Sequence, residues 1–87
     1  MASGERIGEV THFFGKISVA VLNLSKDLKV GDNVHFLGSN TDFQQVIQSM
    51  QVEHQDVTEV SAGDDVAVKV AQRVRKGDSV FRLAPEA

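Results

Sequence analysis

The tetrapeptide pattern Gly-Asp-x-Val occurs three times in this chain, each time directly before a segment of alternating apolar residues. The copies are Gly31-Asp32-Asn33-Val34, Gly63-Asp64-Asp65-Val66 and Gly77-Asp78-Ser79-Val80. Glycine adopts positive φ without steric cost, and the aspartate side chain can cap the loop. Each copy therefore predicts a turn after which the valine enters a β-sheet in a fixed register. The intervals between the copies differ, so the repeat does not indicate a solenoid.

Residues 46–70 contain the second of these turns, and they predict two long strands separated by an acidic connection. Apolar residues recur at every second position on both sides of the turn, which is typical of half-buried strands. We expect the rest of the chain to wrap around this hairpin. The alternating residues are Val46, Met50 and Val52 before the turn and Val66, Val68 and Val70 after it.

Other apolar segments predict strands on either side of this hairpin. In the segment 7–14 the alternation places Val10, His12 and Phe14 on one face. The segment 17–24 is apolar on both faces, as expected for a strand that is covered on both sides. The remaining predicted strands are Val34 to Leu37, a long central strand that begins at Phe43, and the segments that begin at Val66 and Val80.

No segment has a helical period over a dozen residues, so we predict an all-β fold. The prediction is a closed antiparallel six- to seven-stranded barrel, because closure leaves no strand edge open to aggregation. A single domain is expected over residues 6–83, with flexible ends at residues 1–5 and 84–87. The proposed core residues are Val10, Val19, Val21, Val34, Phe36, Met50, Val52, Val66, Val68 and Val70.

The length of 87 residues allows one small domain. A domain of this size buries only about 60 to 65 per cent of the surface of its unfolded chain. The sequence has no cysteine, which excludes disulfides and thiolate metal sites and favours a reducing cytoplasm. Because neither a signal peptide nor an apolar run of about 18 residues is present, we expect a cytoplasmic monomer without membrane contact.

Charge is distributed unevenly although the formal net charge is only −3. The segment 53–65 holds five acidic residues and no Lys or Arg, whereas the segment 69–82 is mainly basic. Two interpretations stay open: solvated loop ends that keep a small domain soluble, or a local contact for phosphate or an acidic partner. The predicted RNA-binding or partner-binding residues are Lys69, Arg73, Arg75, Lys76 and Arg82, with Lys26 and Lys29 added if the loops converge.

Aromatic side chains could add base stacking to these phosphate contacts. Most of the five phenylalanines must lie in the core, and Phe13 is our candidate for a stacking platform. Three or four phosphate contacts would give a salt slope of roughly −2 to −3 on single strands, so binding would be weak at physiological ionic strength.

Catalytic chemistry is not predicted. His12, His35 and His54 lie on separate predicted strands without ligand-type partners at short spacing, so no metal site is expected. There is no Gly-x-Ser-x-Gly elbow, and a small barrel filled by side chains leaves little room for a substrate. We therefore expect a protein that is not an enzyme and that has no catalytic residue, metal or cofactor.

A series of short motifs occurs in an order known from one family. The motifs are Gly8-Glu9-Val10, Leu28-Lys29-Val30-Gly31-Asp32-Asn33-Val34 with Gly38, Ser49-Met50-Gln51 before Ala62-Gly63-Asp64-Asp65-Val66, and Lys76-Gly77-Asp78-Ser79-Val80. In this order residues 7–83 resemble the second, β-barrel domain of translational GTPases such as elongation factor Tu. The resemblance implies a stand-alone barrel of the translation-protein type. It departs from the family at Ala67, where a Gly is usual, and no GxxxxGK[ST] motif is present, so no nucleotide binding is expected.

Similar barrels also close the C-terminal end of the collagenase-like peptidase family, some of whose members act in RNA modification. Our main hypothesis is a non-catalytic module that docks to an RNA-containing or ribosome-associated partner. The alternative is a protein-protein accessory domain for a separately encoded GTPase or for an RNA-modifying enzyme of the collagenase-like peptidase family. A third hypothesis is a small-molecule site at the mouth of the barrel.

Overall fold

The computed structural model describes residues 4–83, and every regular element in this range is a β-strand. The predicted all-β class is therefore confirmed. This range contains no helix that could cross a lipid bilayer. The strands are β1 (Gly4–Phe14), β2 (Val19–Leu24), β3 (Leu28–Lys29), β4 (Asn33–Gly38), β5 (Thr41–Val46), β6 (Met50–Val52), β7 (Gln55–Val57), β8 (Glu59–Val60), β9 (Asp65–Lys69) and β10 (Ser79–Leu83).

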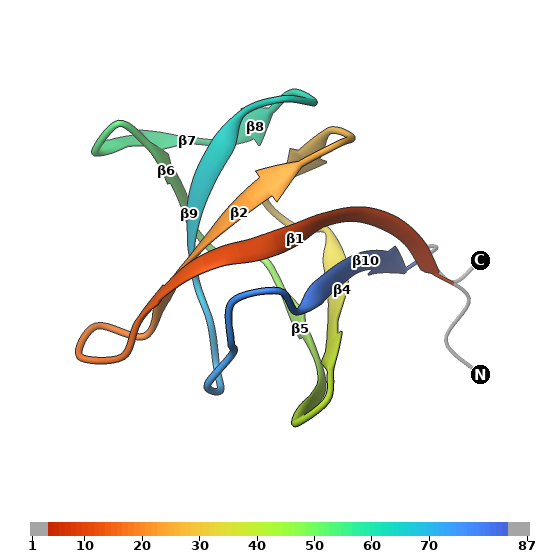
Figure 1. The fold of residues 1–87 in the computed structure, drawn as a ribbon. Helices are drawn as coiled ribbons and strands as arrows, with labels where there is room; N and C mark the ends of the chain where they lie inside the picture. The colour runs from red at the N-terminus through yellow and green to blue at the C-terminus, as the bar shows by residue number, and fades with distance from the viewer. Residues whose placement is uncertain (1–3, 84–87) are drawn as a thin grey trace.

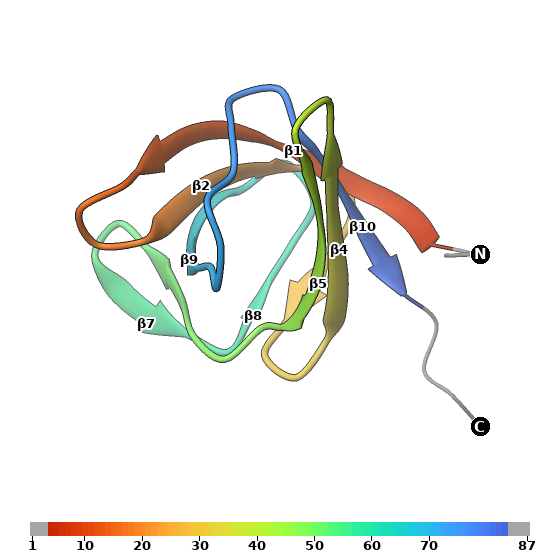
Figure 2. The same ribbon diagram turned by 90° about the horizontal axis from the view of Figure 1, so that it is seen from below.

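Eight of the strands form one antiparallel sheet in the order β5-β4-β10-β1-β2-β9-β6-β7, and β3 pairs with β8 in a small second sheet. The long strand β1 lies between β10 and β2, and the β1–β2 hairpin extends away from the other strands (Figure 1). Seen from below, the strands curve around a common interior (Figure 2). Gly4 and Glu5 belong to β1, so the ordered strand begins before residue 6, and the other predicted terminal segments lie outside the described residues.

The three Gly-Asp turns have the same internal hydrogen bonds. In each turn the glycine has a φ between 92° and 98°, and the aspartate N–H donates to the carbonyl three residues earlier at 3.0 to 3.3 Å. The aspartate carboxylate accepts in return from the N–H of that earlier residue at 2.8 to 3.3 Å. The prediction of a glycine turn capped by aspartate is thus confirmed. The pairs are Lys29 with Asp32, Ser61 with Asp64, and Arg75 with Asp78.

Each Gly-Asp turn also holds one buried residue of a distant segment through two backbone hydrogen bonds. The glycine N–H donates to the carbonyl of that residue, and the residue's N–H donates to the aspartate carbonyl, at 2.7 to 3.2 Å. The turn at Gly31 holds Ile47, the turn at Gly63 holds Leu24, and the turn at Gly77 holds Val10. The valines that follow the turns, Val34, Val66 and Val80, are all fully buried. This confirms the proposed core positions Val34 and Val66 and adds Val80, which the proposed core did not include.

The predicted closed barrel is wrong. The sheet is open, because β5 and β7 lie at its two ends and no pairing between them is present in residues 4–83. The physical reason is that the chain leaves β5 at Ile47, whose backbone groups bond to the first Gly-Asp turn. β7 is only three residues long, so it cannot extend the sheet far enough to meet β5.

A side chain covers part of the open edge of β5. The Gln45 amide nitrogen donates to the carbonyl of Lys69 at 2.9 Å, and the N–H of Ala71 donates to the Gln45 amide oxygen at 2.7 Å. One carboxamide thus replaces the pair of backbone bonds that a neighbouring strand would make. Coverage of this kind protects an edge without closing the sheet.

The region predicted as the central hairpin is divided into more elements than expected. Val46 ends β5 and is exposed, and residues 47–49 form no strand. The next strand, β6, pairs with β9 at Met50 and Val68, as two antiparallel strands of a hairpin would, but it also pairs with the inserted strand β7. The predicted long strand from Phe43 is therefore wrong, whereas the burial of Val66, Val68 and Val70 is confirmed.

Two local features change which residues form the core. A β-bulge between Val10 and His12 turns His12 and Phe14 outward, although Val10 points into the core as predicted. In β2 the buried residues are Ala20, Leu22 and Leu24, so the proposed core positions Val19 and Val21 are only half-buried on the outer face. Val52 is also half-buried and packs against the core from outside.

We expect Gly38→Ala to destabilise the domain. A Cβ atom at Gly38 would overlap the Asp78 carboxylate. Asp78 is only 6% exposed, and its carboxylate accepts a hydrogen bond from the N–H of Arg75. Overpacking of this kind costs about 1 to 3 kcal/mol, measured as the free energy of unfolding in urea. Gly15→Ala is the matched control, because its Cβ would make only ordinary contact at 3.6 Å. Equal stability of the two variants would contradict the prediction.

Candidate docking surfaces

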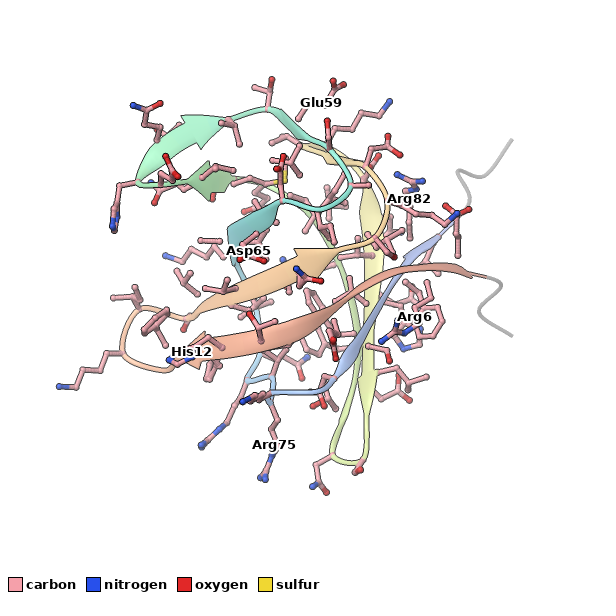
Figure 3. All side chains as sticks on the ribbon, turned by 45° about the horizontal axis from the view of Figure 1, so that its top comes forward. Arg6, His12, Glu59, Asp65, Arg75 and Arg82 are labelled. Atoms are coloured by element: carbon pink, nitrogen blue, oxygen red, sulfur yellow. The ribbon has the colours of Figure 1, made fainter. Side chains whose placement is uncertain are left out.

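The basic residues predicted to form one contact lie on different parts of the molecule. Arg73, Arg75 and Lys76 line the same open hollow. Lys69 is exposed at the end of β9 and does not line this hollow, and Arg82 belongs to β10. Arg75 and Arg82 project from opposite ends of the view in Figure 3. The structure therefore brings together three of the five predicted residues.

The basic hollow has a volume of about 520 Å³ and lies between the segment after β9 and strand β1, which contributes Thr11, His12 and Phe13. Buried Val74 anchors the segment, while the neighbouring Arg73 and Arg75 side chains are exposed. Three cations beside an imidazole and an aromatic ring can accept an anionic group. Contact with RNA at this hollow stays a prediction.

Arg82 forms an ion-pair network with several acidic groups. Its guanidinium donates to the Glu5 carboxylate at 2.8 Å and to the carbonyl of Asp27 at 2.6 Å. The carboxylates of Asp27 and Asp32 lie at 3.5 and 3.8 Å, and Lys26 pairs with Glu5 at 3.5 Å. Arg82 thus joins the C-terminal strand to β1 and to the loop before β3.

These contacts determine the protonation of Arg82. Burial alone would lower the pKa of the guanidinium, but the hydrogen bond with Glu5 and the charges of Asp27, Asp32 and Glu5 outweigh burial and raise the pKa above its ordinary value. Arg82 therefore keeps its charge throughout the pH range in which an arginine side chain is ordinarily charged. Its role in the structure is to hold two strands together.

The aromatic residue expected to stack on bases is not the exposed one. Phe13 is half-buried and packs against the core, whereas Phe14 is 45% exposed. The bulge in β1 reverses the two faces at this point. Phe13 nevertheless lines the basic hollow beside Arg73 and Arg75, so its role as a stacking platform stays a prediction. The ring of Phe14 instead lies against His12, with ring centroids 4.8 Å apart.

The three histidines do not converge. His12 and His54 are exposed, and buried His35 shares a hydrogen bond of 2.6 Å between its Nε2 and the Asp42 carboxylate. In residues 4–83 no three His, Asp or Glu side chains are placed to hold a metal ion. In the same range no serine or threonine hydroxyl is hydrogen-bonded to a histidine. The geometry thus offers no assembled nucleophile and base.

A second hollow, which the sequence analysis missed, lies on the outer face of β2, β9 and β6 and has a volume of about 460 Å³. Its floor is apolar: Val21 of β2 lies opposite Ala67 of β9, with Phe14 and Val52 beside them. Asn23 could have revealed this face, because an exposed polar residue in β2 sets Val19 and Val21 on its own side of the strand.

The rim of the second hollow is acidic. Glu53, Asp64 and Asp65 line it, and no Lys or Arg does so among the described residues. The Asp64 carboxylate is engaged in its turn, and the Asp65 carboxylate accepts from the Asn23 side chain at 2.9 Å. Figure 3 shows Asp65 on β9 beside β2. We call this feature, with its apolar floor and its three carboxylates, the acidic-rim hollow.

Comparison with known proteins adds a family context. No model of a known protein family matches the sequence. The chain is 42% identical over 78 residues to an uncharacterized protease of Methanocaldococcus jannaschii, and the match covers 88% of this chain but 19% of that protein. The chain thus spans about a fifth of the length of this relative.

Two solved structures of one bacterial domain share the fold. They are crystal structures of the C-terminal domain of a Geobacillus thermoleovorans protein named as a U32 peptidase. One has a TM-score of 0.86 at 20% identity, covering 92% of this chain and 93% of that one. The other, a selenomethionine variant, has a TM-score of 0.84 at 21% identity, covering 88% and 98%. The fold of this chain is the fold of that C-terminal domain.

These similarities correct the first family resemblance. The assignment to the second domain of elongation factor Tu-like GTPases is wrong, because the sequence relative is a protease and the structural neighbours are U32 peptidase C-terminal domains. The short Gly-Asp motifs that suggested it are turn motifs of β-structure, and turn chemistry is shared by unrelated β-folds. The findings fit the alternative, an accessory domain of the collagenase-like peptidase family.

We expect Arg82→Lys to lower the free energy of unfolding by about 1 kcal/mol. The two terminal nitrogens of the guanidinium donate to Asp27 and Glu5 respectively, and the single ammonium group of lysine cannot reproduce this geometry. The pKa of Arg82 is raised on folding, so this contribution is fully present below the ordinary pKa of arginine. Urea denaturation at neutral pH measures it. Arg73→Lys, at an exposed position, is the control and should leave stability unchanged; a loss as large as that of Arg82→Lys would refute the assigned role.

We expect His54→Gly to stabilise the protein. Glu53 and His54 form the two-residue turn between β6 and β7, and both have positive φ, 52° and 65°. This backbone costs an L-residue roughly 1 to 2 kcal/mol, and glycine removes the cost. Thermal unfolding should show a higher midpoint for His54→Gly and a lower one for Gln55→Gly, which places glycine in the extended strand β7.

Proposed function

We propose that this chain is a non-catalytic accessory domain that docks, through protein-protein contacts, onto an enzyme of the collagenase-like peptidase family. The observation that carries the proposal is the 42% identity, over nearly all of this chain, to one fifth of a protease. The remaining four fifths of such a protein supply a body that this domain can contact.

The geometry supports a docking role over a catalytic one. The interior is filled by buried side chains such as Phe36, Leu22 and Met50. The two hollows with chemically distinct linings are open to the surface. A catalytic pocket is deep and has several polar groups that converge on one point. The two open hollows lack this convergence, which supports contact with another macromolecule over catalysis.

Capture of the tagged chain from a lysate of its source cells tests the proposal. One half of the lysate is treated with nuclease before capture, and bound proteins are identified by mass spectrometry. We expect a collagenase-like peptidase-family protein to remain bound after nuclease treatment. The purified chain alone should leave gelatin and casein intact.

A matched variant separates protein docking from RNA contact. Arg73→Gln, Arg75→Gln and Lys76→Gln together remove the cations of the basic hollow. The proposal predicts that this triple variant captures the same enzyme as the parent chain. If the enzyme is no longer captured after nuclease treatment and is not captured by the triple variant, RNA contact explains the binding and the proposal is wrong. Hydrolysis of gelatin by the purified chain would contradict the statement that the chain is non-catalytic.

A further inference from the structure

The outer face of the sheet beside the β1–β2 hairpin carries a row of apolar side chains that is bordered by His12 on β1 and by Lys69 on β9. His12, Val21 and Ala67 lie opposite one another in register across β1, β2 and β9. Phe14 lies opposite Val19 in the next row. Val19, Val21 and Ala67 are half-buried and Phe14 is 45% exposed, so part of this hydrocarbon surface is open to solvent.

The turn of the same hairpin carries another exposed apolar side chain. Ile17, in the turn between β1 and β2, is 60% exposed, the highest value among the large exposed apolar residues. The β1–β2 hairpin that carries Ile17 reaches out from the rest of the sheet (Figure 1). Exposed apolar groups that adjoin a hollow mark an interaction site more strongly than single scattered ones.

Other exposed apolar residues do not form a comparable surface. Leu37 and Val46 lie on the outer face of β4 and β5, but the polar pair of His35 and Gln44 separates them in the register. Asp42 also bonds to His35 across this face. The apolar row beside the β1–β2 hairpin is thus the stronger candidate of the two faces.

The charges around the hollow define the partner. Three carboxylates, Glu53, Asp64 and Asp65, surround the apolar floor, and no Lys or Arg lines it within residues 4–83. Carboxylates that line one hollow favour a cationic partner over an anionic one. The same carboxylates repel phosphate, so nucleic acid does not fit this surface.

We propose that the acidic-rim hollow docks a polypeptide surface in which an aliphatic or aromatic side chain is flanked by Lys or Arg. The apolar side chain enters over Val21 and Ala67, and the flanking cations meet Glu53 and Asp65. The inference rests on the proposed function, because it assigns the docking of the enzyme body to this face. The sequence relative is about five times longer than the matched segment, so it contains ample chain to supply such a surface.

Titration of the isotopically labelled chain with three synthetic peptides, followed by NMR, tests the inference. The first peptide alternates lysine with leucine and phenylalanine. The second has glutamate in place of lysine, and the third has glycine and serine in place of the apolar residues. We expect the first peptide to shift the amide signals of Val21, Val52 and Ala67 at millimolar concentration, and the other two peptides to shift them far less.

Matched variants locate the binding. Ala67→Arg fills the floor and adds a positive charge, so it should weaken binding of the first peptide about tenfold or more. Gln44→Arg adds the same positive charge at an exposed position of β5, away from the hollow, and is the control for Ala67→Arg. Glu53→Lys should weaken binding and reduce its salt dependence, whereas Glu9→Lys, which changes the net charge equally, should not.

Several results would overturn the inference. They are equal shifts with all three peptides, shifts confined to the basic hollow or to the outer face of β4 and β5, and no shift at any peptide concentration. Because the peptide experiment uses the unmodified chain, it decides the matter even if a variant fails to fold. If one of these results is obtained but a peptidase-family enzyme is still captured after nuclease treatment, the proposed function holds. Only the assignment of docking to this face is then wrong.

Discussion

The structure depends on one repeated backbone contact. Three Gly-Asp turns each hold a buried residue of a distant segment, Val10, Leu24 or Ile47, through a pair of hydrogen bonds. Buried backbone groups must find partners, and these pairs satisfy them at the points where the strands end. The turns also place the valines that follow them in the core. In a domain without disulfides, such repeated long-range contacts fix the register of strands that would otherwise slip.

The sheet stays open because these contacts determine where the chain leaves the strands. Ile47 leaves β5 to meet the turn at Gly31, so β5 does not continue along the sheet. The Gln45 side chain then bonds to the backbone of Lys69 and Ala71, beside the open edge. Buried side chains occupy the core, and the two hollows lie on the outside of the strands.

The β1–β2 hairpin separates two surfaces of opposite charge. Thr11, His12 and Phe13, which follow the bulge, line the basic hollow, and Phe14 lines the acidic-rim hollow. Opposite potentials on adjoining faces can fix the orientation of a binding partner. Similarity to part of a much longer protease is consistent with this arrangement.

The sequence by itself determined the β-class, the three capped turns, and the burial of the valines after them, because turn chemistry and alternation are local properties. It also grouped Arg73, Arg75 and Lys76, which are neighbours in the chain. Only the tertiary structure decided that the sheet stays open, that Arg82 serves an ion-pair network, and that Val21 and Ala67 form the floor of an acidic-rim hollow. These features depend on a bulge and on contacts between residues far apart in sequence, and no local pattern specifies which distant groups will meet.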